Sequence, residues 1–136
     1  MASRFGDDST PTTRAVQLWL ILIAAAHNRQ ILTPRMIADL ISLRSIAYVA
    51  RPLCYLRAWC IQNELPPLTV IMSTADAEHP NQYRPLRNLD RDRERVFNYP
   101  WFDLIPPTAA ELEQSIDSRS VDIVTFDVGA ELGIMA

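Results

Sequence analysis

Lysine is absent from the sequence, and all 13 basic residues are arginines. The chain therefore cannot form a lysine Schiff base or supply the phosphate-binding lysine of a P-loop, and enzyme classes built on either are excluded. Glycine is also scarce, with three residues in 136, which argues against a glycine-rich phosphate loop and repeated tight hairpins. Ten prolines, by contrast, divide the chain into short segments.

Cysteine and histidine occur only twice each, at Cys54, Cys60, His27 and His79. The cysteines are six residues apart on a predicted helix and cannot reach each other, so we expect reduced core thiols in a cytoplasmic protein. The four residues lack the paired spacing of a zinc site, and no metal or cofactor is predicted. We expect His27 to be partly buried and His79, in an Asp-x-Glu-His loop, to be solvated, so no enzyme active site is predicted.

Charge divides the chain into a basic body and an acidic tail. Residues 11–102 hold eleven arginines and seven acidic residues, a net charge of +4, whereas residues 103–136 hold one arginine and seven acidic residues, a net charge of −6. A hydrophobic content of 49% is sufficient for a packed core. We expect a disordered segment over residues 1–12, one domain over residues 13–102 and an acidic extension over residues 103–136.

The first predicted helix, residues 14–28 with Thr13 as its cap, is apolar nearly all round. Such a helix is either central to its own core or shared with another subunit. Residues 14–28 are therefore also the candidate contact of a homodimer. The longest apolar run, Leu18 to Ala26, is too short to span a membrane, and no leader pattern precedes it, so a soluble protein is expected.

Two further helices are predicted on either side of a tight turn at residues 42–45. Thr33 followed by Pro34 is typical of a helix start and predicts a helix over residues 34–43. Its expected buried stripe is Met36, Ile37, Leu40 and Ile41. Pro52 interrupts the next helical region, which predicts a short turn at 46–51 and a main helix at 52–63. Its expected inward residues are Leu53, Leu56, Trp59 and Cys60, and its outward residues are Arg51, Tyr55, Arg57 and Gln62.

A β-hairpin is predicted after the third helix. Pro66 and Pro67 end that helix, and the β-branched, apolar residues 68–73 predict a strand. Residues 74–82 read as a polar loop and residues 83–86 as the returning strand. Three helices followed by a hairpin is the element order of a winged helix-turn-helix domain, so the predicted fold class is mainly α with a small β-hairpin.

The C-terminal part is predicted to add further elements. Residues 90–95 alternate acid and arginine and are expected to be solvated, whereas the aromatic residues 96–102 are expected to pack back over the core. Thr108 and Glu111 match a capping box and predict a helix to about residue 116. Residues 121–126 predict a last strand, so the extension is expected to be partly helical and partly strand.

The stretch from about Ile31 to Met72 resembles the winged helix-turn-helix half of the DNA alkyltransferase and alkyltransferase-like family. The matching features are Thr33-x-x-x-Ile37-Ala38-x-Leu40-Ile41, a short turn, a second helix and Asn63-Glu-Leu-Pro66-Pro-Leu. The resemblance implies this fold and contact with DNA. The family's Pro-Cys-His-Arg or Pro-Trp-His-Arg box has no counterpart after Leu68, and its base-stack arginine falls near Tyr48, so alkyl transfer is not implied.

The arginines of the body are the main functional signal. In a winged helix the second helix of the motif enters the major groove and the wing contacts the backbone, and arginine suits both guanine edges and phosphates. The predicted DNA-binding residues are Arg44, Tyr48, Arg51, Tyr55 and Arg57, with Arg84 and Arg87 on the wing. The predicted function is a non-catalytic, double-stranded-DNA-binding regulator of prokaryotic or phage origin. The alternative is a protein-interaction module, such as a phage-encoded inhibitor or adaptor with the same fold, in which the acidic tail and the aromatic segment form the contact.

Overall fold

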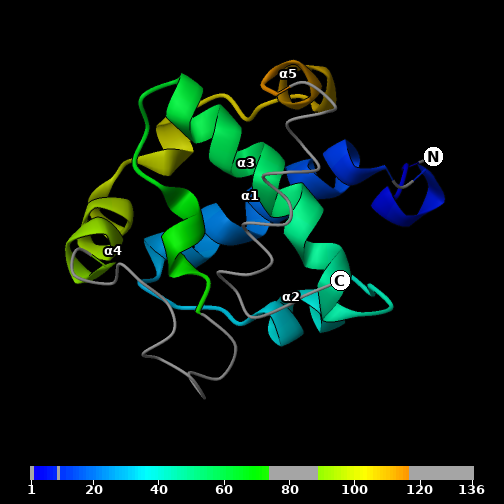
Figure 1. Ribbon diagram of the computed structural model, residues 1–136, viewed down its shortest axis with the longest axis horizontal. Coiled ribbons are helices and arrows are strands. Elements are labelled where there is room, and N and C mark those ends of the chain that lie inside the picture. Colours follow the sequence, from blue (N-terminus) through cyan, green and yellow to red (C-terminus); the bar gives the residue numbers. More distant parts are fainter. Residues whose placement is uncertain (1, 9, 74–88, 117–136) are drawn as a thin grey trace.

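The computed structural model describes residues 2–8, 10–73 and 89–116, and this part of the chain is mainly helical (Figure 1). Its α-helices are α1 (Pro11–His27), α2 (Pro34–Leu40), α3 (Ala50–Gln62), α4 (Leu89–Asn98) and α5 (Ala109–Gln114). Short 3-10 helices accompany them: η1 (Phe5–Asp8), η2 (Ile46–Val49), η3 (Leu68–Ile71) and η6 (Trp101–Asp103). The mainly α class predicted from the sequence is confirmed.

Helix α1 is central, because it contacts α3, α4 and α5. Trp19 and Leu22 are completely buried by the chain itself, which explains why this helix lacks a polar face. The helix begins three residues earlier than predicted, because Thr10 rather than Thr13 is its N-cap. Thr10 Oγ1 accepts a hydrogen bond from the Thr13 backbone N–H, and Thr13 Oγ1 accepts one from the Thr10 backbone N–H. Residues 1–12, predicted to be disordered, thus include η1 and the start of α1.

Helix α2 begins as predicted, since the Thr33 side chain accepts a hydrogen bond from the Met36 backbone N–H. It ends at Leu40 rather than at residue 43. The predicted buried stripe is half wrong: Ile37 and Ile41 are buried, but Met36 and Leu40 are 49% and 65% exposed. This seven-residue helix contacts mainly η2, so only its Ile37 side is covered.

The third helical region follows the predicted division, with η2 first and α3 from Ala50 onward. Pro52 lies in the first turn of α3, where a backbone N–H has no intrahelical partner, so the helix continues through it. The predicted inward residues Leu53, Leu56 and Cys60 are buried, and Trp59 is half-buried. Of the residues predicted to face outward, Gln62 is exposed as expected, whereas Arg51, Tyr55 and Arg57 are half-buried.

The strand predicted at residues 68–73 is wrong, because most of it forms the 3-10 helix η3. Leu68 and Ile71 are both completely buried, and their spacing of three residues brings them onto one face of a 3-10 turn. Burial of these two side chains outweighs the strand preference of the β-branched residues. In the described part of the chain, the β structure is one parallel bridge between Leu32 and Met72. The predicted strands at 83–86 and 121–126 lie outside the described residues.

The segment after residue 88 packs onto the body. Residues 90–95, predicted to be a solvated segment, belong to helix α4, whose Val96 is completely buried. The aromatic residues Phe97, Tyr99 and Trp101 pack back over the core as predicted, whereas Phe102 is 59% exposed. Trp101 Nε1 donates a 2.7 Å hydrogen bond to the Val96 carbonyl, and the Trp101 ring lies edge-to-face against Trp19, with 5.6 Å between ring centroids. Trp59 packs against Trp19 in the same way at 5.2 Å, so the three tryptophans form one cluster.

Helix α5 confirms the predicted capping box. The Thr108 side chain accepts a hydrogen bond from the Glu111 backbone N–H, and the Glu111 carboxylate accepts one from the Thr108 backbone N–H. The helix ends at Gln114, and its Leu112 is completely buried. Because α5 contacts α1 and α3, the first part of the predicted acidic extension belongs to the core.

Candidate nucleic-acid interface

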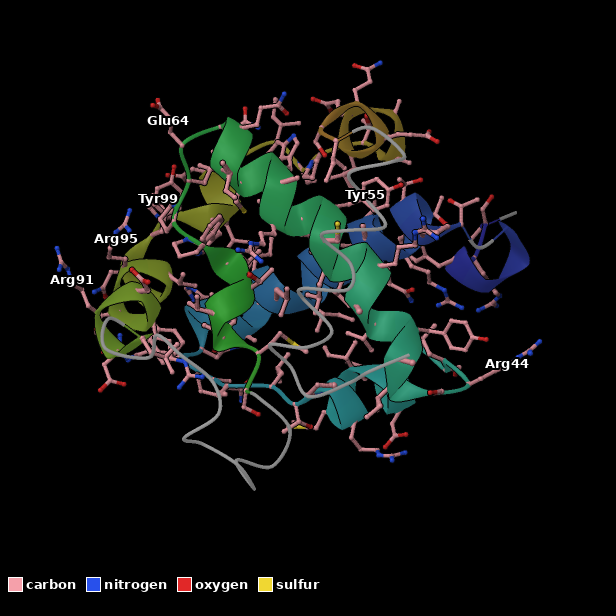
Figure 2. All side chains as sticks on the ribbon, in the orientation of Figure 1. Arg44, Tyr55, Glu64, Arg91, Arg95 and Tyr99 are labelled. Atoms are coloured by element: carbon pink, nitrogen blue, oxygen red, sulfur yellow. The ribbon has the colours of Figure 1, made fainter. Side chains whose placement is uncertain are left out.

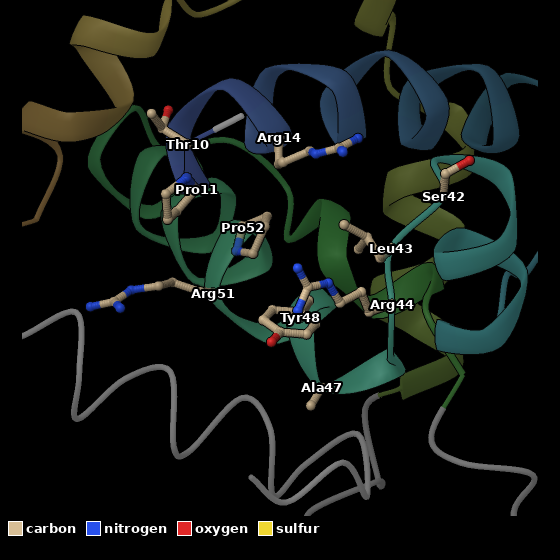
Figure 3. A pocket seen from close by; sticks show the side chains of 10 residues that line it. All are labelled: Thr10, Pro11, Arg14, Ser42, Leu43, Arg44, Ala47, Tyr48, Arg51 and Pro52. Carbon is tan, nitrogen blue, oxygen red and sulfur yellow. The ribbon is translucent and has the colours of Figure 1, made fainter. Parts of the chain in front are cut away.

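Three of the predicted DNA-binding residues line one pocket between the start of α1, the turn after α2 and the start of α3 (Figure 3). These residues are Arg44, Tyr48 and Arg51. Tyr55 and Arg57 lie further along α3 and are not part of its lining. The predicted wing residues Arg84 and Arg87 lie outside the described residues. The structure therefore assembles the part of the predicted site nearest the turn.

The pocket, called here the arginine pocket, has a volume of about 710 Å³. Among the described residues, its charged lining consists of Arg14, Arg44 and Arg51 and includes no acidic residue. The apolar lining is Pro11, Leu43, Ala47 and Pro52, and the uncharged polar lining is Thr10, Ser42 and Tyr48. Arg14 and Arg44 are positive charges with no carboxylate among the described lining residues, so they attract anions, and arginine suits phosphate in particular.

Arg14 belongs to this site although the sequence did not identify it. Its Nη1 atom donates to the Ile41 carbonyl at 2.9 Å and to the Gln17 side-chain oxygen at 2.8 Å, so the guanidinium is held in place. Among the described residues, Nη2 of Arg14 has no hydrogen-bond partner. The sequence contains one indication that Arg14 has a special role, because it is the only arginine or acidic residue in the apolar segment from Pro11 to Asn28.

The backbone of the turn holds Arg44 and Tyr48 at the exposed side of the pocket. Ser42 adopts a left-handed conformation with φ 59°, which reverses the chain after α2. Ser45 then caps η2, because its Oγ accepts a hydrogen bond from the Ala47 N–H and its carbonyl accepts one from the Tyr48 N–H. Arg44 is exposed, and Tyr48 is 55% exposed. Both side chains are therefore accessible to a ligand.

Other arginines of the body serve the fold. The Arg93 side chain donates a 2.8 Å hydrogen bond to the Val70 carbonyl and ties α4 to η3. Burial lowers the pKa of Arg93, against the opposing effect of Asp90. Arg29 pairs with Glu94 and lies over the Phe97 ring, with 4.9 Å from Cζ to the ring centroid.

The residues with catalytic or metal-binding chemistry do not gather at the arginine pocket. His27 is exposed, rather than partly buried as predicted, and its ring packs edge-to-face against Phe102. Cys54 and Cys60 are buried free thiols, and burial raises the pKa of Cys60 to about 11. His79 lies outside the described residues. In the part of the chain that the structure covers, no three His, Cys, Asp or Glu residues are grouped to hold a metal ion.

No helix among the described residues combines the length and apolar character needed to cross a membrane. Comparison of the chain with protein-family models, with curated proteins and with solved structures gives no match.

Proposed function

We propose that this chain is a non-catalytic domain that binds double-stranded DNA through the arginine pocket. The observation that carries the proposal is the presence of Arg14 and Arg44, with no carboxylate among the described lining residues, at the turn between α2 and α3. In helix-turn-helix proteins, the turn and the first residues of the second helix meet the DNA. Arg44, Tyr48 and Arg51 occupy the corresponding positions of the α2–turn–α3 unit.

The charge of the whole chain does not oppose this proposal. The net charge is −3, but the acidic excess lies in residues 103–136, whereas residues 11–102 carry a net +4. Interactions between exposed charges fade beyond a Debye length of about 8 Å at physiological salt. Binding therefore depends on the local charge at the pocket more than on the net charge.

The proposal is tested by fluorescence anisotropy of a short labelled DNA duplex over a range of salt concentrations. The logarithm of the binding constant should fall with the logarithm of salt by about 0.9 per neutralised phosphate. Arg44→Ala should weaken binding and lower this slope by about 1. Arg91→Ala is the matched control, because Arg91 is also exposed and lies on α4 at the opposite edge of the molecule (Figure 2). Absence of duplex binding at low salt, or equal effects of both variants, would contradict the proposal.

A second candidate function, a protein-interaction module, is favoured by the exposed apolar surface of α2. Leu40 and Met36 are 65% and 49% exposed, and with Leu32 and Ile37 they line a groove of about 430 Å³. Exposed apolar surface of this kind often marks contact with a protein. Leu40→Ser, which adds no charge, should leave duplex binding unchanged in the first function and should abolish partner binding in the second.

A further inference from the structure

The arginine pocket combines two kinds of surface that a single phosphate does not need. One is the positive surface of Arg14, Arg44 and Arg51, and the other is the apolar wall of Pro11, Leu43 and Pro52. Tyr48 adds an aromatic ring that is 55% exposed. A volume of about 710 Å³ falls within the range of about 300–1,000 Å³ that is usual for small-molecule sites.

We propose that the arginine pocket binds a nucleoside phosphate, with the phosphate held by Arg14 and Arg44 and the base packed on Tyr48. This goes beyond duplex binding, because a base that is paired and stacked in a duplex cannot lie on a protein side chain. The ligand is either a free nucleotide or the phosphorylated end of a nucleic-acid strand, which share this chemistry.

The state of Arg14 supports the phosphate half of the site. Its hydrogen bonds to Ile41 and Gln17 both use Nη1, which fixes the guanidinium before any ligand arrives. Nη2 has no partner among the described residues and is available to an anionic oxygen. Arginine that is already held in place loses less conformational entropy on binding than a free side chain does.

Arg44 and Tyr48 support the rest of the site. In the described part of the chain, Arg44 makes no ion pair, and no carboxylate of the lining competes for it. Tyr48 is the only aromatic residue among the lining residues that the structure describes. Stacking of a base on an aromatic ring tolerates any base, so the pocket is expected to recognise the nucleoside phosphate without base selectivity.

The test uses isothermal titration calorimetry of the full chain with adenosine 5′-monophosphate, inorganic phosphate and adenosine as separate probes. The nucleotide should bind more tightly than either half. Arg44→Ala should weaken nucleotide binding about tenfold or more, as expected for loss of a charge-assisted hydrogen bond. Tyr48→Ala should weaken nucleotide and adenosine binding but not phosphate binding, whereas Tyr48→Phe, which keeps the ring, should bind the nucleotide as the native chain does.

Arg91→Ala is again the control and should leave all three probes unaffected. Both Arg44 and Tyr48 are exposed, so these variants should fold, which circular dichroism checks. Equal affinity for nucleotide and phosphate, or an equal loss with Arg91→Ala and Arg44→Ala, would overturn the proposal whether or not duplex DNA binds. Nucleotide binding without duplex binding would support this inference and refute the proposed function.

A single-stranded oligonucleotide, with and without a 5′-phosphate, then identifies the source of the ligand. Tighter binding of the phosphorylated strand, lost in Arg44→Ala, assigns the pocket to strand ends. Binding of the free nucleotide alone assigns it to a soluble nucleotide. Both results support a nucleoside-phosphate site.

Discussion

Replacing Trp101 by alanine tests whether the segment after α4 is part of the core. Trp101 is 2% exposed, lies against Trp19 and donates its indole N–H to the Val96 carbonyl. Truncation of a buried tryptophan to alanine typically costs about 3–5 kcal/mol of unfolding free energy. The hydrogen bond contributes about 1 kcal/mol of this. The Val96 carbonyl is not left unpaired, because it also accepts from the Tyr99 backbone N–H.

The size of this effect is large for a domain of this kind. Single domains have unfolding free energies of about 5–15 kcal/mol, so Trp101→Ala should remove a substantial part of the total. Urea denaturation followed by far-ultraviolet circular dichroism should show a lower midpoint, with the slope little changed. Circular dichroism is preferred because the substitution removes one of the three tryptophans that would report by fluorescence.

Phe102→Ala is the control for this measurement. Phe102 is the next residue and is also aromatic, but it is 59% exposed, with one ring contact to His27. Its removal should cost less than about 1 kcal/mol. If Trp101→Ala costs no more than Phe102→Ala, then η6 does not pack on α1 in solution and the assignment of this segment to the core is refuted.

Three further predictions concern the thiols, α1 and the tail. Burial raises the pKa of Cys60 from 9.0 to about 11, so above pH 9 the thiol ionises more readily in the unfolded chain than in the folded one. The stability that the buried, neutral thiol contributes should therefore be complete below pH 9 and lost as the pH rises toward about 11. Cys60→Ala should flatten that loss in denaturation midpoints measured across this range, and an unchanged profile would contradict the assignment. Leu22→Glu should unfold the chain because Leu22 is completely buried, whereas Leu20→Glu, at a 45% exposed position, should keep the fold. Sedimentation of the native chain and of Leu20→Glu then tests the predicted homodimer, which a native monomer at high concentration would exclude. The double variant Asp122→Asn and Asp127→Asn removes two negative charges from the tail, so it should bind duplex DNA more tightly than the native chain at low salt but not at high salt, where charges are screened. Equal affinity of the variant and the native chain at low salt would show that the tail charge does not compete with DNA.

Local signals in the sequence were sufficient for several elements. The caps at Thr33 and Thr108 were predicted correctly, because a cap depends on residues within three positions of each other. The apolar character of residues 14–28 indicated a helix that is either central or shared, and the structure makes it central. The division of the region around Pro52 into a turn and a helix was correct to within two residues, because proline is accommodated in the first turn of a helix and so marks its start.

The grouping of some residues of the arginine pocket was predicted for the same reason. Arg44, Tyr48 and Arg51 lie within eight positions on one turn and the helix after it, so their proximity follows from local structure. Tyr55 and Arg57 follow on the same helix, but α3 carries them away from the arginine pocket. Helical periodicity alone could not show where the pocket ends.

Only the tertiary structure decided what depends on distant contacts. Arg14 joins the pocket because it bonds to the Ile41 carbonyl, 27 positions away in the sequence. Residues 68–71 form a 3-10 helix because their buried side chains fit against α1 and α3, although their β-branched composition favours a strand. Met36 and Leu40 have the spacing of a buried stripe, yet no described element covers them fully. The sequence by itself determined where α2 and α5 begin and which helix is apolar throughout, because these properties are local. Which faces are buried and which arginines meet were decided by packing between segments far apart in the chain.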